Sequence, residues 1–182
     1  MILSEQIKRK IVAETFENVE CDGLLEYLEQ SGYYTAPASK NHHGNWRGAL
    51  FEHSFQVAFE LQRMTQQLRL DWERRESPMI VGLLHDLCKV DQYNLIEDTF
   101  RGVPIETVEY NKNQLITGHG DKSCIYALQH IELTDEEIVC IRYHMGAFIE
   151  SEKESYTKAV NKFPNVLWTH TADMIASQVK GI

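Results

Sequence analysis

A histidine and an aspartate stand next to each other, as His85 and Asp86, in the otherwise apolar run Leu83-Leu84-His85-Asp86-Leu87. The run is typical of a buried helix, and burying an imidazole and a carboxylate there without partners costs several kcal/mol. A divalent metal ion would offset that cost, because neutral imidazole and ionised carboxylate both bind Mn, Fe, Zn or Ni. Adjacent helical residues point about 100° apart, so one ion can lie between the two side-chain tips. The pair is therefore a candidate metal-binding element of a helical protein.

Four further candidate ligands each lie on or beside a separate predicted helix: His53, His119, His144 and Asp173. Taken singly, a histidine on an apolar face is better explained as a hydrogen-bonded core residue. Taken together with His85 and Asp86 they give the order H…HD…H…H…D, and helical bundles build metal sites from one inward ligand on each of several helices. The sequence therefore predicts one metal site from all six residues. Of the other histidines, His170 is expected beside a ligand or in the core, and His130 at the boundary with solvent.

The hydrophobic pattern is mostly helical, and helix-start signals mark several boundaries. Ser4 can cap a first helix, Ser77-Pro78 opens the helix that delivers His85, and Thr134 begins a capping box. Residues 33–47 are expected to form a loop, residues 92–114 a small β-hairpin, and the stretch before Pro164 a polar connection. Expected helices span about 4–19, 22–29, 48–70, 77–86, 120–131, 134–144 and 164–179.

From residue 42 to residue 173 the order of these side chains resembles that of the HD-domain superfamily of metal-dependent phosphohydrolases. The resemblance implies an all-α fold, an HD-domain helical bundle carrying the hairpin as a small insertion. It also implies one or two divalent transition-metal ions as cofactors, namely Mn, Fe, Ni or Co, with Zn as a further candidate. His119 and His144 would hold the second ion, bridged by Asp86, or contact a substrate phosphate. The implied ligands of the first ion are His53, His85, Asp86 and Asp173.

The sequence resembles, more narrowly, the HD domain of bacterial 3′→5′ exoribonucleases. The similarity lies in residues 48–54, in His42-His43 and in Gly118-His119. Those enzymes carry an OB-fold domain ahead of it, and nothing in this sequence corresponds. A single HD domain over residues 1–182 is therefore expected, with its ligand-bearing core at about 42–176. Cys88 stands where the family's HDxGK pattern usually has glycine. Because cysteine tolerates a left-handed helix end poorly, the helix is expected to run one turn further, and Cys88 is not interpreted as a ligand.

The composition restricts the classes of molecule that the protein is expected to bind. Acidic residues outnumber basic ones 27 to 18, a net charge of −9, so no strong nucleic-acid binding is expected. A small phosphorylated substrate, above all a nucleotide, fits better, because bound metal ions make a cleft locally positive. No stretch reaches the roughly 18 apolar residues of a membrane span. The four cysteines lack CxxC spacing and the N-terminus lacks a hydrophobic signal core, which indicates a cytoplasmic protein without disulfides.

Several basic side chains are candidate substrate contacts. Lys89 follows Asp86 by three residues, nearly one helical turn, so its ammonium can offset charge on a phosphoryl oxygen. The alternative is a lysine that favours the dipole at a helix C-terminus. The other candidates each have a solvated surface role as the alternative: His42, His43, Arg47, Lys122 and Arg142.

The expected function is a metal-dependent phosphohydrolase, either a phosphomonoesterase or a phosphodiesterase. A bound metal ion lowers the pKa of water and makes hydroxide available to attack phosphorus, with Asp86 and Lys89 as the catalytic residues. Two alternatives stay open at the level of sequence. One is an HD-fold diiron oxygenase, which shares the ligand order. The other is a metal-stabilised module that binds a nucleotide without turnover. The sequence does not indicate the oligomeric state.

Overall fold

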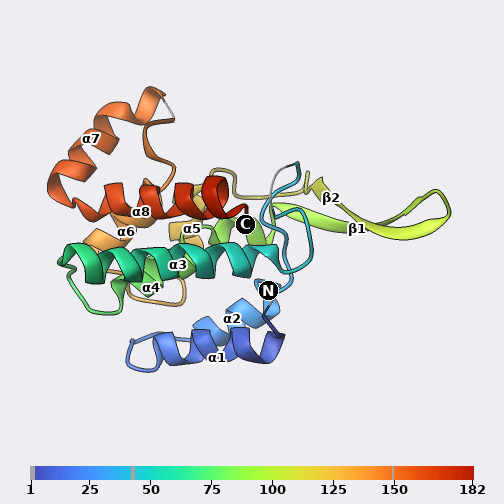
Figure 1. Ribbon diagram of the computed structural model, residues 1–182, viewed down its shortest axis with the longest axis horizontal. Helices are drawn as coiled ribbons and strands as arrows, with labels where there is room; N and C mark the ends of the chain where they lie inside the picture. The colour runs from blue at the N-terminus through green and yellow to red at the C-terminus, as the bar shows by residue number, and fades with distance from the viewer. Residues whose placement is uncertain (1–2, 42–43, 149) are drawn as a thin grey trace.

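The protein is mostly helical, with one two-stranded sheet that projects from the helical body (Figure 1). The computed structural model describes residues 3–41, 44–148 and 150–182. None of the helices within these ranges is long and apolar enough to cross a membrane. The predicted helical architecture with a single hairpin is confirmed. The α-helices are α1 (Glu5–Phe16), α2 (Leu24–Gln30), α3 (Ala49–Leu68), α4 (Ser77–Leu84), α5 (Gly120–Ala127), α6 (Asp135–Arg142), α7 (Lys153–Lys162) and α8 (Asn165–Met174).

Helix starts follow the capping signals of the sequence. The Ser4 hydroxyl accepts a hydrogen bond from the Ile7 N–H at the start of α1. At the start of α6, Thr134 and Glu137 form a reciprocal capping box, in which each side chain accepts from the backbone N–H of the other. Pro78 lies in the first turn of α4, where its missing N–H costs no hydrogen bond.

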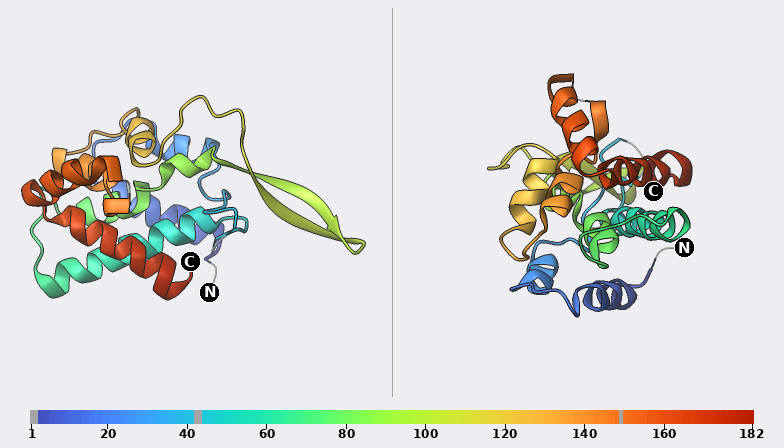
Figure 2. Two further views of the ribbon diagram at one scale, coloured as in Figure 1. Left: turned by 90° about the horizontal axis from the view of Figure 1, so that it is seen from above. Right: turned by 90° about the vertical axis from the view of Figure 1, so that its left-hand side faces the viewer.

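The core is built around α3. Side chains from all eight α-helices meet in one buried apolar cluster, which includes Val12, Leu61, Leu84, Ile141 and Ala172. Helix α8 runs alongside α3 in Figure 1 and in both views of Figure 2. Helices α3 and α4 approach closely enough that a Cβ atom added at Gly82 would lie 2.2 Å from the Cα of Ala58. Only glycine fits that contact.

The sheet is an antiparallel hairpin formed by β1 (Tyr93–Phe100) and β2 (Val103–Tyr110), as the sequence predicts. Tyr93 pairs with Tyr110 at the base and Phe100 with Val103 at the tip. Arg101 and Gly102 both have positive φ in the turn between them. The hairpin extends away from the helices, so most of its side chains are exposed (Figure 1 and Figure 2).

Several boundaries differ from the prediction. The first helix ends at residue 16 instead of 19, and α5 ends at 127 instead of 131. Helix α7 occupies a stretch expected to be a polar connection; the spacing of Tyr156, Ala159 and Val160 on one face is the helical signal that sequence reasoning missed, and Ala159 alone among the residues of α7 is buried. After α8 the chain continues as a π-helical turn, η4 (Ile175–Lys180). Short 3₁₀ turns, η2 (Gly146–Phe148) and η3 (Glu150–Glu152), precede α7.

Helix α4 does not continue through the His-Asp pair as an α-helix, which corrects the expectation drawn from Cys88. The helix ends at Leu84, His85 is its C-cap, and Asp86 leaves the helical region with φ −105° and ψ 19°. A 3₁₀ turn, η1 (Leu87–Val90), follows. Asp86 therefore lies at a break in the backbone between two helical turns.

Candidate metal centre

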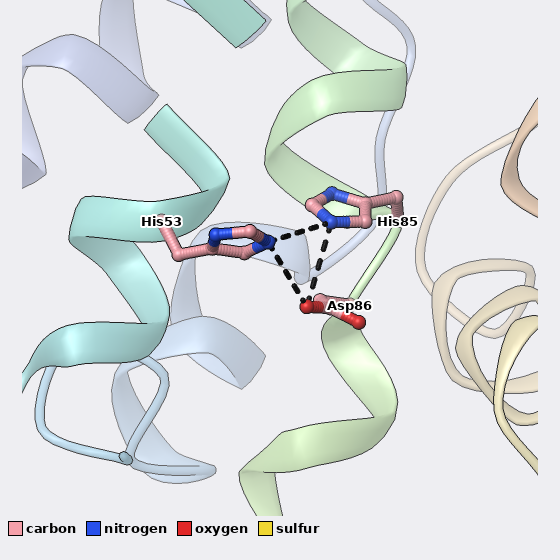
Figure 3. Close-up of side chains that lie close together, drawn as sticks. All are labelled: His53, His85 and Asp86. Atoms are coloured by element: carbon pink, nitrogen blue, oxygen red, sulfur yellow. Dashed lines mark hydrogen bonds and ion pairs between the residues drawn. The ribbon is translucent and has the colours of Figure 1, made fainter. Parts of the chain in front are cut away.

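Asp86 lies at the centre of a buried group of imidazoles. In Figure 3 the rings of His53, from α3, and His85, from the end of α4, both point at its carboxylate. The Nε2 atoms of His53 and His85 each lie 3.4 Å from Asp86 Oδ2 and 3.3 Å from one another. These three side chains are within reach of a single ion.

The other predicted ligands reach the same carboxylate from different elements. His119, the N-cap of α5, places Nε2 3.0 Å from Asp86 Oδ1, and His144, just after α6, places Nε2 3.6 Å from that oxygen. Asp173 of α8 places Oδ1 3.2 Å from His53 Nε2. The structure thus brings all six predicted ligand residues together, although up to 120 residues separate them in the sequence (173 − 53).

Hydrogen bonds to Nδ1 fix the orientation of three rings. Carbonyl oxygens only accept hydrogen bonds, so a neutral imidazole whose Nδ1 contacts one carries its proton there and keeps a lone pair on Nε2. The contacts are 2.8 Å from His85 to the Gly82 oxygen, 2.7 Å from His144 to the Ile141 oxygen and 2.9 Å from His53 to the Ile182 oxygen. When these rings are neutral, as metal ligands are, three lone pairs therefore face Asp86.

The polar atoms of this cluster are not satisfied by the described residues alone. Asp86 Oδ1 and His144 Nε2 are buried without a hydrogen-bond partner among them. His119 Nε2 lies close to that oxygen but not in a direction that makes a good hydrogen bond. Buried polar atoms are normally paired, and two nitrogen lone pairs 3.3 Å apart repel unless a proton or cation lies between them. A divalent cation fits this set of N and O donors.

The carboxylates of the cluster are held in their ionised form. Burial raises the pKa of Asp86, but the charges of Lys89 and then His85 lower it well below its usual value. Burial likewise opposes ionisation of Asp173, and the hydrogen bond from His53 with the charge of His85 still lowers its pKa. Lys89 Nζ lies 2.6 Å from Asp86 Oδ2, and although burial lowers the Lys89 pKa, Asp86 raises it overall.

The imidazoles differ in how they hold a proton. Burial, followed by the charges of His85 and His119, lowers the pKa of His144 to about 3, so its ring is neutral at pH 7 and able to bind a metal. Burial lowers the pKa of His119, but the neighbouring Asp86 carboxylate and Cys88 sulfur raise the value to about 10. A cation entering beside His119 would therefore displace a proton.

A pocket of about 500 Å³ opens onto the cluster. Asp86, Lys89 and Asp173 reach its wall, and the side chain of His119 is 26% exposed there. Sequence reasoning did not single out the residues of η4 that line it, although Ser177 follows Asp173 by one helical turn and so shares its face. The lining residues are Ala38, Ser39, His53, Asp86, Lys89, His119, Met145, His170, Asp173, Met174, Ser177, Gln178 and Ile182.

Among the described residues, the other predicted substrate contacts Arg47, Lys122 and Arg142 are not part of this lining. Arg47 pairs with Glu106 of the hairpin, and Arg142 pairs with Glu152 and Asp121. Their role toward a substrate stays a prediction, as does that of Lys122. His42 and His43 fall outside the described residues.

Lys122 is fully buried and bonds to the carboxylate of Asp91 and, at 2.8 Å, to Gln114 Oε1. His170 lies beside a predicted ligand, with Nδ1 2.8 Å from the carbonyl oxygen of His144. His130 is half-buried and stacks on Tyr27.

Cys88 is the member of the cluster that sequence reasoning set aside. Its Sγ lies 3.3 Å from His119 Nδ1, and Asp86, Cys88 and His119 together form a group that could hold a metal ion. The only sequence signal was its departure from the glycine usual at this position of the HD pattern.

Comparisons of the chain with models of protein families, with curated proteins and with solved structures found no match. The structure itself shows a helical fold with a buried His/Asp group that could bind metal.

Proposed function

We propose that this protein is an HD-type metal-dependent phosphohydrolase that hydrolyses a nucleotide or another small phosphoester. One observation carries the proposal: the buried Asp86, among four imidazoles, has an oxygen that receives no hydrogen bond from the described residues, and Lys89 beside it reaches a pocket. The order of the ligand residues, which resembles that of the HD superfamily, supports the same assignment.

The residues fit one or two divalent ions. His53, His85, Asp86 and Asp173 would hold the first; His119 and His144 would hold the second, with Asp86 shared. Their nitrogen and oxygen donors suit Mn, Fe, Ni or Co, and also Zn. A bound ion would supply hydroxide at neutral pH as the nucleophile.

Lys89 is the chain's own contribution to charge stabilisation. Its side chain is 15% exposed, at the pocket wall, and Asp86 keeps it protonated. From there the ammonium can contact a non-bridging phosphoryl oxygen as negative charge develops on it.

The pocket favours a small substrate. Its volume matches a small-molecule site, and apolar side chains such as Met145 and Met174 can pack against the part of the substrate that does not react. The net charge of −9 opposes a long nucleic acid.

The test is a metal analysis of the purified protein, paired with a panel of phosphomonoesters and phosphodiesters under Mn, Fe, Ni and Co. Asp86→Ala should abolish metal occupancy and hydrolysis together. Lys89→Ala should keep the metal and lower turnover by roughly 10²- to 10³-fold. Lys158→Ala is the matched control, because this exposed lysine is also paired with a carboxylate, that of Glu154, and should change neither.

Three outcomes would contradict the proposal. Metal loss in Lys89→Ala would make that residue part of the ligand structure. Bound iron with substrate-dependent O₂ consumption would favour the diiron oxygenase. Tight nucleotide binding without hydrolysis under any of these metals would favour a binding module.

A further inference from the structure

The four imidazoles around Asp86 are not held in the same way. Three of them place Nδ1 against a backbone carbonyl oxygen. The fourth, His119, places Nδ1 3.3 Å from the sulfur of Cys88. Cys88 is fully buried, and its own backbone N–H donates to Ser123 Oγ at 3.1 Å, which fixes the residue against α5.

A histidine binds one ion through one nitrogen, and Nε2 is the nitrogen of His119 that faces the cluster. It lies 3.0 Å from Asp86 Oδ1, the buried oxygen to which no residue in the described part of the chain donates a hydrogen bond. In a neutral ring bound through Nε2, Nδ1 carries the proton and donates it to an acceptor. The acceptor in this structure is the Cys88 sulfur.

We infer that Cys88 is a positioning residue of the metal centre, which holds His119 by an Nδ1–H···Sγ hydrogen bond so that Nε2 binds the second ion. The inference rests on the metal centre proposed above. Cys88 thereby accepts the Nδ1–H of His119, as a backbone carbonyl oxygen does for each of the other three rings.

His119 depends on this contact more than its neighbours depend on theirs. Its side chain is 26% exposed, whereas those of His53, His85 and His144 are 6% exposed or less. It also lies at the N-cap of α5, outside the regular helix, after Gly118 with φ +114°. Hydrogen-bond partners of this kind typically change metal affinity by about 10- to 100-fold when they are removed.

Direct ligation by Cys88 is the competing arrangement, because Asp86, Cys88 and His119 offer donor atoms within 4.8 Å of one another. It would require His119 to turn Nδ1 toward the ion and give up the approach of Nε2 to Asp86. A thiolate ligand gives cobalt(II) a sulfur-to-metal charge-transfer band in the near ultraviolet, whereas a thiol that only accepts a hydrogen bond does not.

The experiment is a titration of metal-free protein with cobalt(II), followed by calorimetry and absorption. Wild type should bind two ions without the charge-transfer band. Cys88→Ala should weaken the second ion by about 10- to 100-fold and leave the first unchanged. Cys88→Ser should recover most of the loss, because a hydroxyl oxygen also accepts the Nδ1–H. Cys124→Ser is the control: that buried thiol donates to the Ile138 carbonyl, and both affinities should stay as in wild type.

Four results would overturn the positioning role of Cys88: a charge-transfer band in wild type that Cys88→Ser loses, a wild type that binds one ion, an unchanged second affinity in Cys88→Ala, or a serine variant as weak as alanine. If Cys88→Ala does not fold, the spectrum of wild type and the affinities of Cys88→Ser decide between the two arrangements. A wild type that binds no cobalt and no other divalent ion would instead contradict the proposed function.

Discussion

Two buried carboxylates, those of Glu137 and Asp86, illustrate opposite uses of a charge inside this fold. Both are almost completely inaccessible to solvent. Arg74 and Ser77 donate to Glu137 Oε1 at 2.7 and 2.8 Å, and Arg74 and the Thr134 N–H donate to Oε2 at 2.6 and 3.0 Å. Lys89 pairs with one oxygen of Asp86, and the other has no hydrogen bond from the described residues.

Glu137 is therefore a structural charge, whereas the charge of Asp86 is suited to binding a ligand. The donors to Glu137 come from the segment before α4, from α4 itself and from the start of α6, so its carboxylate joins the two helices. Apart from Lys89, Asp86 is surrounded by imidazole nitrogen atoms, and in the three neutral rings whose Nδ1 protons are engaged Nε2 accepts rather than donates. A fully paired buried charge stabilises the fold, whereas one surrounded by acceptors needs a cation from outside.

The largest effect on folding is expected at Glu137. Glu137→Ala should lower the free energy of unfolding by about 3 kcal/mol, because it leaves the Arg74 guanidinium and the N-terminus of α6 without their acceptor. Urea denaturation measures the loss, which should be the same with and without metal. Glu132→Ala, on an exposed neighbouring carboxylate, should change stability by less than about 0.5 kcal/mol. A Glu137 variant as stable as wild type would show that the charge network contributes nothing.

Metal should stabilise the protein through Asp86 and not through Glu137. At a metal concentration about 100 times Kd, the gain in unfolding free energy is about 2.7 kcal/mol. Thermal denaturation with added Mn, Co or Ni, and again after chelation, measures it. The gain should vanish in Asp86→Ala and persist in Glu137→Ala, if the latter folds at the assay temperature. A metal-induced shift that survives in Asp86→Ala would place the ion elsewhere.

Two lysines extend the comparison from anions to cations. Lys122 is fully enclosed by Asp91, Gln114 and the ring of Tyr126, whereas Lys89 reaches the pocket. Lys122→Met should cost about 2 kcal/mol of stability in urea and leave KM unchanged, because its partners belong to the base of the hairpin. The opposite pattern, a raised KM with unchanged stability, would restore the substrate role predicted from the sequence.

The smallest effect is expected for the exposed pair of Arg47 with Glu106, which joins the loop before α3 to the hairpin. Arg47→Ala should cost less than about 1 kcal/mol, because the side chains are 56% and 38% exposed and water screens their attraction. Urea denaturation at low and high salt checks this, and the difference from wild type should shrink as salt is added. A loss above 2 kcal/mol would show that this pair behaves like a buried one.

The sequence predicted much of this arrangement where local chemistry determines it. The caps at Ser4 and Thr134 and the hairpin turn at Arg101-Gly102 depend on neighbouring residues alone, and all three are as expected. The convergence of the six candidate ligands was predicted from their order and from the HD resemblance, and the structure brings them together. That they bind metal stays a prediction.

What the sequence missed depends on contacts between distant segments. Nothing near Lys122 indicates that Asp91, 31 residues earlier, neutralises it in the interior. The same is true of Cys88 and His119, which only the packing of η1 against α5 brings together. Helix α7 was missed for a different reason: its apolar residues Tyr156, Ala159 and Val160 lie at helical spacing, but they are few and stand among polar and charged residues.

Gly82 carries a consequence for the metal centre, although it touches none of the ions proposed there. Its hydrogen-only side chain lets α4 press against Ala58 of α3, and this contact determines how near the two backbones that bear His53 and His85 can come. A methyl group at residue 82 would push the two helices apart. It would thereby separate the Nε2 atoms of His53 and His85, which lie 3.3 Å from one another. The affinity of the proposed site for a cation therefore depends partly on the absence of a Cβ atom at Gly82.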